Sequence, residues 1–299
     1  MLKRTRSFLV LVMLLMTVTM SAQVTTATMS GKVTAQDEPI IGATIVAIHE
    51  PSGTRYGTVT NVSGQFNLQG MRTGGPYKVE ISYVGYQTAI YKGINLLLGE
   101  NYVLNVSLKE SSELLDEVVV TASKESNMKS DRAGAIMNAN RDMISNTPTI
   151  SRSISDIMRL SPQGADVGNG FAVGGGNYRQ SFVTVDGAAF NNTFGLGGNL
   201  PANGSPISLD ALEQVTVAVT PFDVRQSGFT GGAINAVTRS GDNQFRGTAY
   251  MYFNNENLKG SKVDDYELLR SKAQYYTYGA SFGGPIIKDK LFFFVNGEY

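Results

Sequence analysis

The chain has 299 residues, and its 25 lysines and arginines balance 25 aspartates and glutamates, so its formal net charge is zero. A balanced charge provides no long-range field for nucleic acid, which argues against a nucleic-acid partner. The absence of cysteine and the single histidine leave no ligand set for zinc. A serine triad needs a histidine with an orienting acid, and we interpret the one histidine, His49, as a surface residue at a strand end rather than a general base. We therefore expect a protein that is not an enzyme, with no catalytic residue, no metal site and no cofactor.

The N-terminus is typical of an export signal. Lys3, Arg4 and Arg6 form a basic segment, Phe8 to Met16 is an uninterrupted apolar run, and Ser21-Ala22 provides small residues for cleavage. We predict a signal peptide over residues 1–22 and a mature chain that starts at Gln23. The length that remains suits two folded units joined by linkers.

Residues 23–109 alternate between short apolar runs and turn signals, which predicts a small antiparallel β-sandwich. The predicted strands include Ala43–Ile48, Arg55–Val59, Gln65–Leu68 and the run that starts at Tyr77. His49 follows one of these strands, and we expect it to be a surface residue at the strand end.

Several runs of this segment resemble the carboxypeptidase-regulatory-like domain, a prealbumin-like β-sandwich. They are, in chain order, Ser30–Val33, Pro39–Thr44, Thr58–Asn61, Gly64–Phe66 and Tyr83–Tyr86. Such domains stand at the N-terminus of outer-membrane receptors in Bacteroidetes-type bacteria. Related sandwiches bind carbohydrate, so the resemblance raises that function, although the chain has no tryptophan for sugar stacking.

Residues 110–132 read as a linker, because polar and serine-containing segments flank the stretch Leu114 to Ser123. The valines in the centre of this stretch predict a short strand. From the flanks alone, two interpretations have equal weight: a strand of a neighbouring domain, either the last of the sandwich or the first of the next unit, or a strand that pairs with another protein.

Residues 133–241 combine short helical elements, glycine loops and strands. Helical spacing predicts a helix within Ser151–Leu160, and apolar runs predict strands over Phe182–Val185 and Gln214–Thr220. The glycine-rich loop from Gly168 to Gly176 has neither the third glycine nor the lysine of a phosphate cradle, so we expect a turn.

This segment resembles the plug domain of TonB-dependent outer-membrane transporters. Thr220 and Ser227 replace a glycine and a tyrosine that are usual in that signature, and the run from Pro221 to Arg225 is similar to the Oar-like branch, which is related to the SusC-like proteins. The plug signature consists of Asp186, Gly187, Glu213, Val215, Pro221, Gly228, Gly231, Gly232, Ile234 and Asn235.

Residues 242–299 offer about three long strands, Arg246–Phe253, Gln274–Gly283 and Leu291–Tyr299, with alternating apolar and polar faces. This pattern favours the start of a transmembrane β-barrel, with a soluble hairpin as the alternative. A plugged transporter barrel needs about 22 strands. We therefore expect an N-terminal portion of a longer protein.

The expected fold is mainly β: a prealbumin-like sandwich, an α+β plug and the first strands of an incomplete outer-membrane barrel. Together with the plug signature, the position of the linker strand resembles a TonB box, formed by Asp116, Glu117, Val118, Val119, Val120, Thr121 and Ala122. The resemblance implies that this strand pairs with a TonB-type energy transducer, working with ExbB/ExbD, to energise transport.

The same resemblance implies a cell outer membrane location in contact with lipid, a periplasmic sandwich and TonB box, and a surface lipoprotein as a further partner. Two alternatives remain: a secreted β-sandwich binding protein, and a truncated receptor without function. The sequence does not identify the substrate or the direction of transport.

Overall fold

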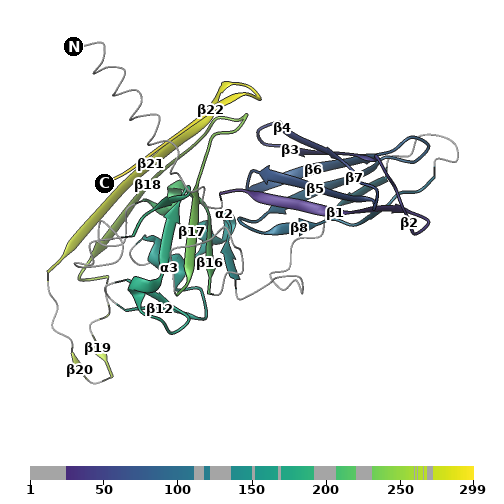
Figure 1. Ribbon diagram of the computed structural model, residues 1–299. Helices are drawn as coiled ribbons and strands as arrows, with labels where there is room; N and C mark the ends of the chain where they lie inside the picture. Colours follow the sequence, from purple (N-terminus) through teal and green to yellow (C-terminus); the bar gives the residue numbers. More distant parts are fainter. Residues whose placement is uncertain are drawn as a thin grey trace, which may run out of the picture.

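A computed structural model describes residues 25–110, 118–121, 136–149, 152–167, 170–191, 207–219, 231–258, 260, 262–264, 266–267 and 272–299. The predicted signal peptide, 1–22, lies outside the described residues. In chain order, the structure contains a two-sheet sandwich, a middle unit of mixed structure and a sheet of long strands, and the middle unit lies between the other two (Figure 1). The prediction of a mainly β fold is confirmed.

The sandwich consists of two five-stranded sheets. The first sheet contains β1 (Ala27–Ala35), β2 (Glu38–Pro39), β5 (Gln65–Met71), β8 (Asn101–Val103) and β9 (Val106–Ser107). The second sheet has the order β10-β7-β6-β3-β4 and contains β3 (Thr44–His49), β4 (Thr54–Val59), β6 (Gly74–Ser82), β7 (Ala89–Leu96) and β10 (Val118–Thr121). Alternate residues of both sheets, such as Met29, Ile45 and Tyr77, are fully buried between them.

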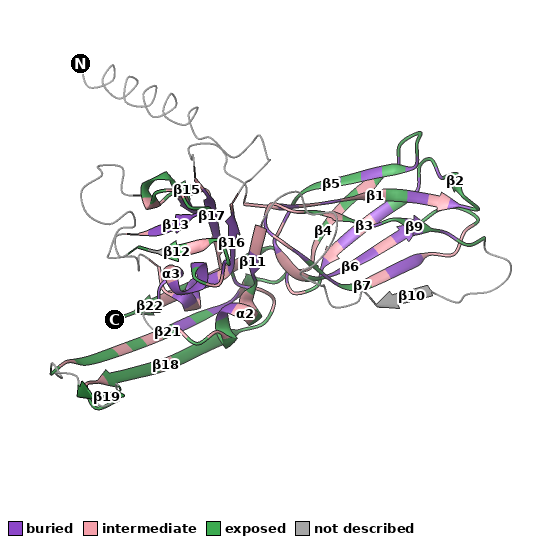
Figure 2. Ribbon diagram, turned by 90° about the horizontal axis from the view of Figure 1, so that it is seen from below, coloured by how far each residue is buried: buried purple, intermediate pink, exposed green. Residues whose placement is uncertain are grey.

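The middle unit is built on a five-stranded sheet with the order β11-β16-β17-β14-β15. Its strands are β11 (Ile136–Ala139), β14 (Phe182–Val185), β15 (Ala188–Ala189), β16 (Leu212–Ala218) and β17 (Ala233–Thr238). Figure 2 shows that β16 and β17 are largely buried. Around the sheet lie α2 (Arg141–Asn146), α3 (Ile154–Met158), the hairpin of β12 (Gly164–Asp166) and β13 (Phe171–Val173), and two 3₁₀ turns, η2 (Tyr178–Gln180) and η4 (Leu209–Ala211).

The helix predicted within Ser151–Leu160 is present but shorter. It begins after Ser153, which accepts a hydrogen bond from Ser155 N while Asp156 forms the reciprocal half of a capping box. Ile157 and Met158 are fully buried, so the helix packs its apolar face onto the core of the middle unit. The glycine-rich loop that follows includes strand β13, whose residues are all buried.

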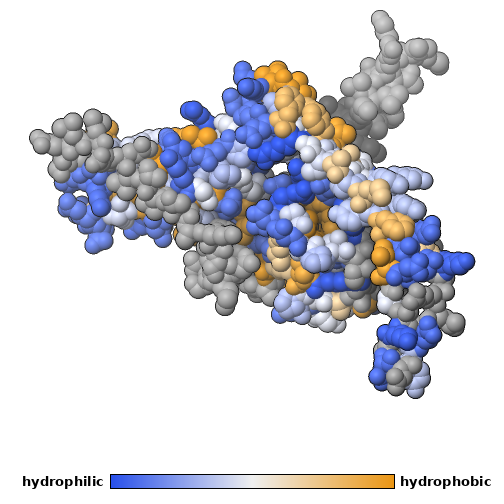
Figure 3. Space-filling view, turned by 180° about the vertical axis from the view of Figure 1, so that it is seen from behind, coloured by the Kyte–Doolittle hydropathy of each residue, from blue (hydrophilic) through white to orange (hydrophobic). Residues whose placement is uncertain are grey.

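Three long strands form the last sheet, in the order β18-β21-β22. They are β18 (Arg246–Asn255), β21 (Gln274–Ile287) and β22 (Leu291–Glu298). In the sequence, a small hairpin of β19 (Lys262–Val263) and β20 (Tyr266–Glu267) connects β18 to β21. Met251, Tyr276 and Phe282 are about half exposed or more, at 60%, 49% and 51%. Apolar side chains lie along the length of this sheet (Figure 3), as they do in strands that meet lipid.

Among the described residues, no helix is long and apolar enough to cross a membrane.

Candidate functional site

The predicted TonB box forms the outermost strand of the sandwich. Val118–Thr121 is strand β10, which pairs in parallel with β7. Asp116, Glu117 and Ala122 lie outside the described residues. The flanks of this stretch left open whether it is a strand of a neighbouring domain or a strand that pairs with another protein, and the structure pairs one of its edges with the sandwich. This is the arrangement expected if the segment is the last strand of that domain, and it leaves the second edge of β10 without a partner strand in the described part of the chain.

The Asp186-Gly187 pair of the plug signature makes the tight turn between β14 and β15. Both residues have positive φ, 49° and 80°, a conformation that glycine and aspartate tolerate best. The Asp186 carboxylate accepts hydrogen bonds from Thr238 N at 2.9 Å and Thr238 Oγ1 at 2.6 Å. The turn is therefore tied to the end of β17, fifty-two residues further along the chain.

The other described signature residues belong to the two central strands or to the turn before them. Glu213 and Val215 lie in β16, and Ile234 and Asn235 lie in β17. Inside the sheet, the Asn235 Oδ1 atom accepts a hydrogen bond from Thr184 Oγ1 at 2.6 Å. Pro221 and Gly228 lie outside the described residues.

Gly231 and Gly232 allow a close approach between the start of β17 and neighbouring segments. Gly231 N donates to Gln180 O at 3.0 Å, and a Cβ atom at Gly232 would lie 2.6 Å from Val173 Cγ1. Such a distance is far below a carbon–carbon contact, so a side chain at Gly232 would push β13 away. The glycines of the signature therefore serve packing.

A charged network, which was not predicted from the sequence, joins the middle unit to the long strands. Asp210, in η4, accepts a hydrogen bond from Arg141 Nη2 at 2.8 Å and has Arg239 Nη1 at 3.6 Å. Thr248 Oγ1, on β18, donates to the same carboxylate at 2.9 Å. The Asp210 side chain is only 10% exposed, so these partners replace most of its hydration.

The arginines of this network also fix the backbone of η4. Arg141 Nη1 donates to the carbonyl oxygens of Asp210 and Leu212, both at 3.2 Å, and Arg239 Nη1 donates to Asp210 O at 3.2 Å. Burial lowers the pKa of Arg239, and the adjacent charge of Arg141 lowers it further. Asp210 therefore compensates two neighbouring guanidinium groups that would otherwise repel each other.

A second contact between the same two parts involves Arg152, the residue before the α3 cap. Its guanidinium carbon lies 4.4 Å and 4.3 Å from the ring centres of Tyr250 and Tyr252, and its Nη2 atom lies 3.2 Å from Glu298 Oε2. The contact thus combines cation–π and ionic attraction with two of the long strands. The contacts of Asp210 and of Arg152 both attach the middle unit to the long strands, which the sequence predicts to be the start of a barrel wall.

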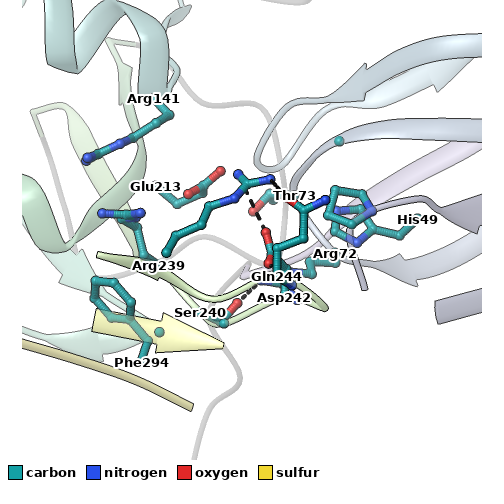
Figure 4. Close-up of a pocket in the computed structure, with 15 residues that line it drawn as sticks. His49, Arg72, Thr73, Arg141, Glu213, Arg239, Ser240, Asp242, Gln244 and Phe294 are labelled. Carbon is teal, nitrogen blue, oxygen red and sulfur yellow. Dashed lines mark hydrogen bonds and ion pairs between the residues drawn. The ribbon is translucent and has the colours of Figure 1, made fainter. Parts of the chain in front are cut away.

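A cavity of about 140 Å³ lies where the sandwich, the middle unit and the long strands meet. In Figure 4, Arg141, Arg239 and Glu213 from the middle unit lie on one side of the cavity and His49 and Arg72 of the sandwich on the other, and Arg72 hydrogen bonds to Ser240. Asn243 N also donates to Pro51 O at 3.0 Å. These bonds connect the sandwich to the segment that leads into β18.

His49 borders this cavity, and the expectation that it is a surface residue is wrong. The residue is 4% exposed, its ring packs against Tyr77 with 4.9 Å between centres, and its Nδ1 atom lies 2.7 Å from Ser52 Oγ. Burial lowers its pKa to about 4, and the charge of Arg72 acts in the same direction. The imidazole is therefore neutral at physiological pH. Within the described ranges, no group of three or more metal-binding side chains gathers around it or elsewhere.

Two family models match the chain. The carboxypeptidase regulatory-like domain matches residues 28–109, and the outer membrane beta barrel domain matches residues 237–299. These matches cover the two ends of the described fold and make the chain similar to outer-membrane proteins with an N-terminal regulatory-like sandwich.

Curated relatives narrow this class. The chain is 31% identical over 151 residues to the TonB-dependent transporter Oar of Myxococcus xanthus, covering 48% of this chain and 14% of Oar. It is 29% identical over 269 residues to the TonB-dependent receptor SusC of Bacteroides thetaiotaomicron, covering 85% of this chain and 24% of SusC. The chain thus spans less than a quarter of the length of either relative. The siderophore receptor PirA of Acinetobacter baumannii aligns with 55% of this chain and 24% of PirA, at 20% identity and a TM-score of 0.44.

These findings support the resemblance inferred from the sequence, to the TonB-dependent receptors of the outer membrane. The relatives are named as transporters and receptors rather than enzymes.

Proposed function

We propose that the chain is the energy-coupling and plug-bearing part of a receptor that transports a substrate across the outer membrane. One observation carries the proposal: the strand Val118–Thr121 directly precedes a folded unit whose polar side chains attach it to the long strands. In this assignment Asp116–Ala122 is the TonB box, residues 133–241 form the plug, and residues 242–299 begin the barrel wall.

The architecture provides a path for force. The first described strand after β10 is β11, which lies at the edge of the plug sheet and pairs only with β16. Its ladder has four residue pairs, from Ile136 with Ala218 to Ala139 with Val215. An edge strand with few ladder bonds opens at lower free energy than the buried strands β16 and β17. Tension on the TonB box would therefore reach β11 first and separate it from β16.

The partner is a TonB-type energy transducer that contributes a strand to the TonB box, coupled to the proton gradient through ExbB/ExbD. Main-chain pairing supplies the affinity in this mode of recognition, and alternate side chains supply the selectivity. The sandwich and the TonB box face the periplasm, and a surface lipoprotein is a further partner on the opposite side. The substrate class is not assigned.

Deletion of Asp116–Ser123 in the receptor tests the proposal. Under a growth condition in which loss of the whole gene slows the source bacterium, we expect the deletion to slow growth equally while the receptor still reaches the outer membrane. Removal of Ser126–Ser130, a polar five-residue segment of the same linker, is the control and should leave growth unchanged. Undiminished growth of the Asp116–Ser123 deletion would contradict the proposal.

A further inference from the structure

The sandwich offers one strand edge that the rest of its own fold leaves open. Strand β7 pairs with β6 on one side, and on the other side it meets only β10 among the described strands. The register joins Val118 to Ala89, Val119 to Ile90, Val120 to Tyr91 and Thr121 to Lys92. Without β10, β7 would be an edge strand with a row of unpaired N–H and C=O groups.

The chain leaves the sandwich beside the start of β7, and β10 begins near the same point. Lys109 O accepts a hydrogen bond from Gln87 N at 2.9 Å, and Glu110 forms a bridge with Tyr86, immediately before β7. Seven residues, 111–117, then separate Glu110 from Val118, whose partner is Ala89 near the same end of β7. A tether this short gives the strand an effective concentration in the millimolar range at this edge.

The regular part of the β7 edge has a defined end. The pairing of β6 with β7 shifts register between Tyr77 and Val79, opposite the part of β7 that follows Tyr91. Gly93 has a φ of 78°, which departs from strand geometry. The regular part of the β7 edge therefore ends at Lys92, which pairs with Thr121, the last described residue of β10.

Ile90 marks the docking position on the outer face of the sheet. It pairs with Glu80 across the β6 ladder, so it points away from the core side chains of Val79 and Ile81. It is nevertheless only 5% exposed. The β7 edge thus presents an apolar residue opposite Val119, in addition to its main-chain groups.

We propose that the β7 edge of the sandwich is an intramolecular docking site that holds the TonB box in a defined parallel register when no energy transducer is engaged. The assignment of this strand as a TonB box rests on the proposed function, whereas the docking of Val118–Thr121 on β7 does not. The regulatory-like sandwich thereby presents Val118–Thr121 as an ordered strand with one edge free for a partner strand. A short parallel ladder is weak, so tension can later detach it.

Engineered disulfides test the docking directly, since none of the 299 residues is a cysteine. The in-register variant carries Ile90→Cys with Val119→Cys. The matched control carries Asn95→Cys with Val119→Cys, which places the first thiol on the same strand but about 16 Å further along it. After mild oxidation of the full chain, the disulfide-linked peptide is quantified by mass spectrometry.

We expect the in-register pair to cross-link at least tenfold faster than the control. A second pair, Lys92→Cys with Thr121→Cys, uses an exposed position of β7 and guards against loss of folding at buried Ile90. Equal rates for in-register and control pairs would overturn the proposal. The cross-linking test contains no transducer, so it reports on docking alone. If the growth test failed, the proposed function would be contradicted, but the in-register pair would still cross-link faster than the control.

Discussion

Replacement of Asp210 by asparagine should loosen the middle unit from the long strands. The substitution keeps the shape of the side chain and an oxygen that can accept the bond from Thr248, but it removes the charge that faces Arg141 and Arg239. Losing a charge-assisted hydrogen bond costs about 1.5 to 3 kcal/mol, and a half-buried pair of uncompensated guanidinium groups adds repulsion. We expect a loss of about 2 to 4 kcal/mol in the local opening free energy.

Hydrogen exchange measured by mass spectrometry at neutral pH reports this loss in the peptides of β16 and β17. The expected loss corresponds to exchange about 30 to 1,000 times faster, since each 1.4 kcal/mol is a factor of about ten. Asp242→Asn is the matched control, because its partner Arg246 is 60% exposed and an exposed pair contributes at most about 1 kcal/mol. Equal exchange rates in the two variants would refute the reasoning.

Three further predictions concern other parts of the fold. His49 has a pKa of about 4 in the folded protein and 6.5 in the unfolded chain, so the unfolded chain binds the proton more tightly. Acidification from pH 6.5 to 4 should therefore lower the free energy of unfolding of the sandwich by up to about 3 kcal/mol. In urea titrations, His49→Gln should remove this loss. Gly232→Val should cost about 1 to 3 kcal/mol in the same titrations, because its side chain would overlap Val173, and an unchanged midpoint would contradict the packing role. Arg152→Ala should raise hydrogen exchange in β22 about tenfold, because Glu298 loses its ionic partner, and no change would contradict that contact.

Local alternation was sufficient to predict several strands of the sandwich and the three long strands. The runs around Ile45 and Phe66 bury every second side chain, which is the property that a two-sheet sandwich imposes on each strand separately. The same reasoning located the long strands, although β21 extends to Ile287, beyond the predicted end at Gly283. Such features depend on neighbours in sequence and can be read without knowledge of the fold.

Contacts between distant segments could not be predicted in this way. Arg141 and Asp210 are 69 residues apart, and nothing in either local sequence indicates that the two side chains meet. His49 was misassigned for the same reason, since Tyr77 and Arg72, which surround it, come from another strand and its preceding turn. The docking of Val118–Thr121 on β7 likewise depends on a register between segments that local pattern does not specify.

The proposed coupling strand can be tested most directly by binding. The periplasmic domain of a TonB-type transducer from the source bacterium is titrated into the receptor by isothermal calorimetry, with and without Asp116–Ser123. The account predicts measurable binding to the intact receptor and at least a tenfold weaker affinity after the deletion, with the Ser126–Ser130 deletion unchanged. Equal affinity of the intact receptor and the Asp116–Ser123 deletion would contradict the account.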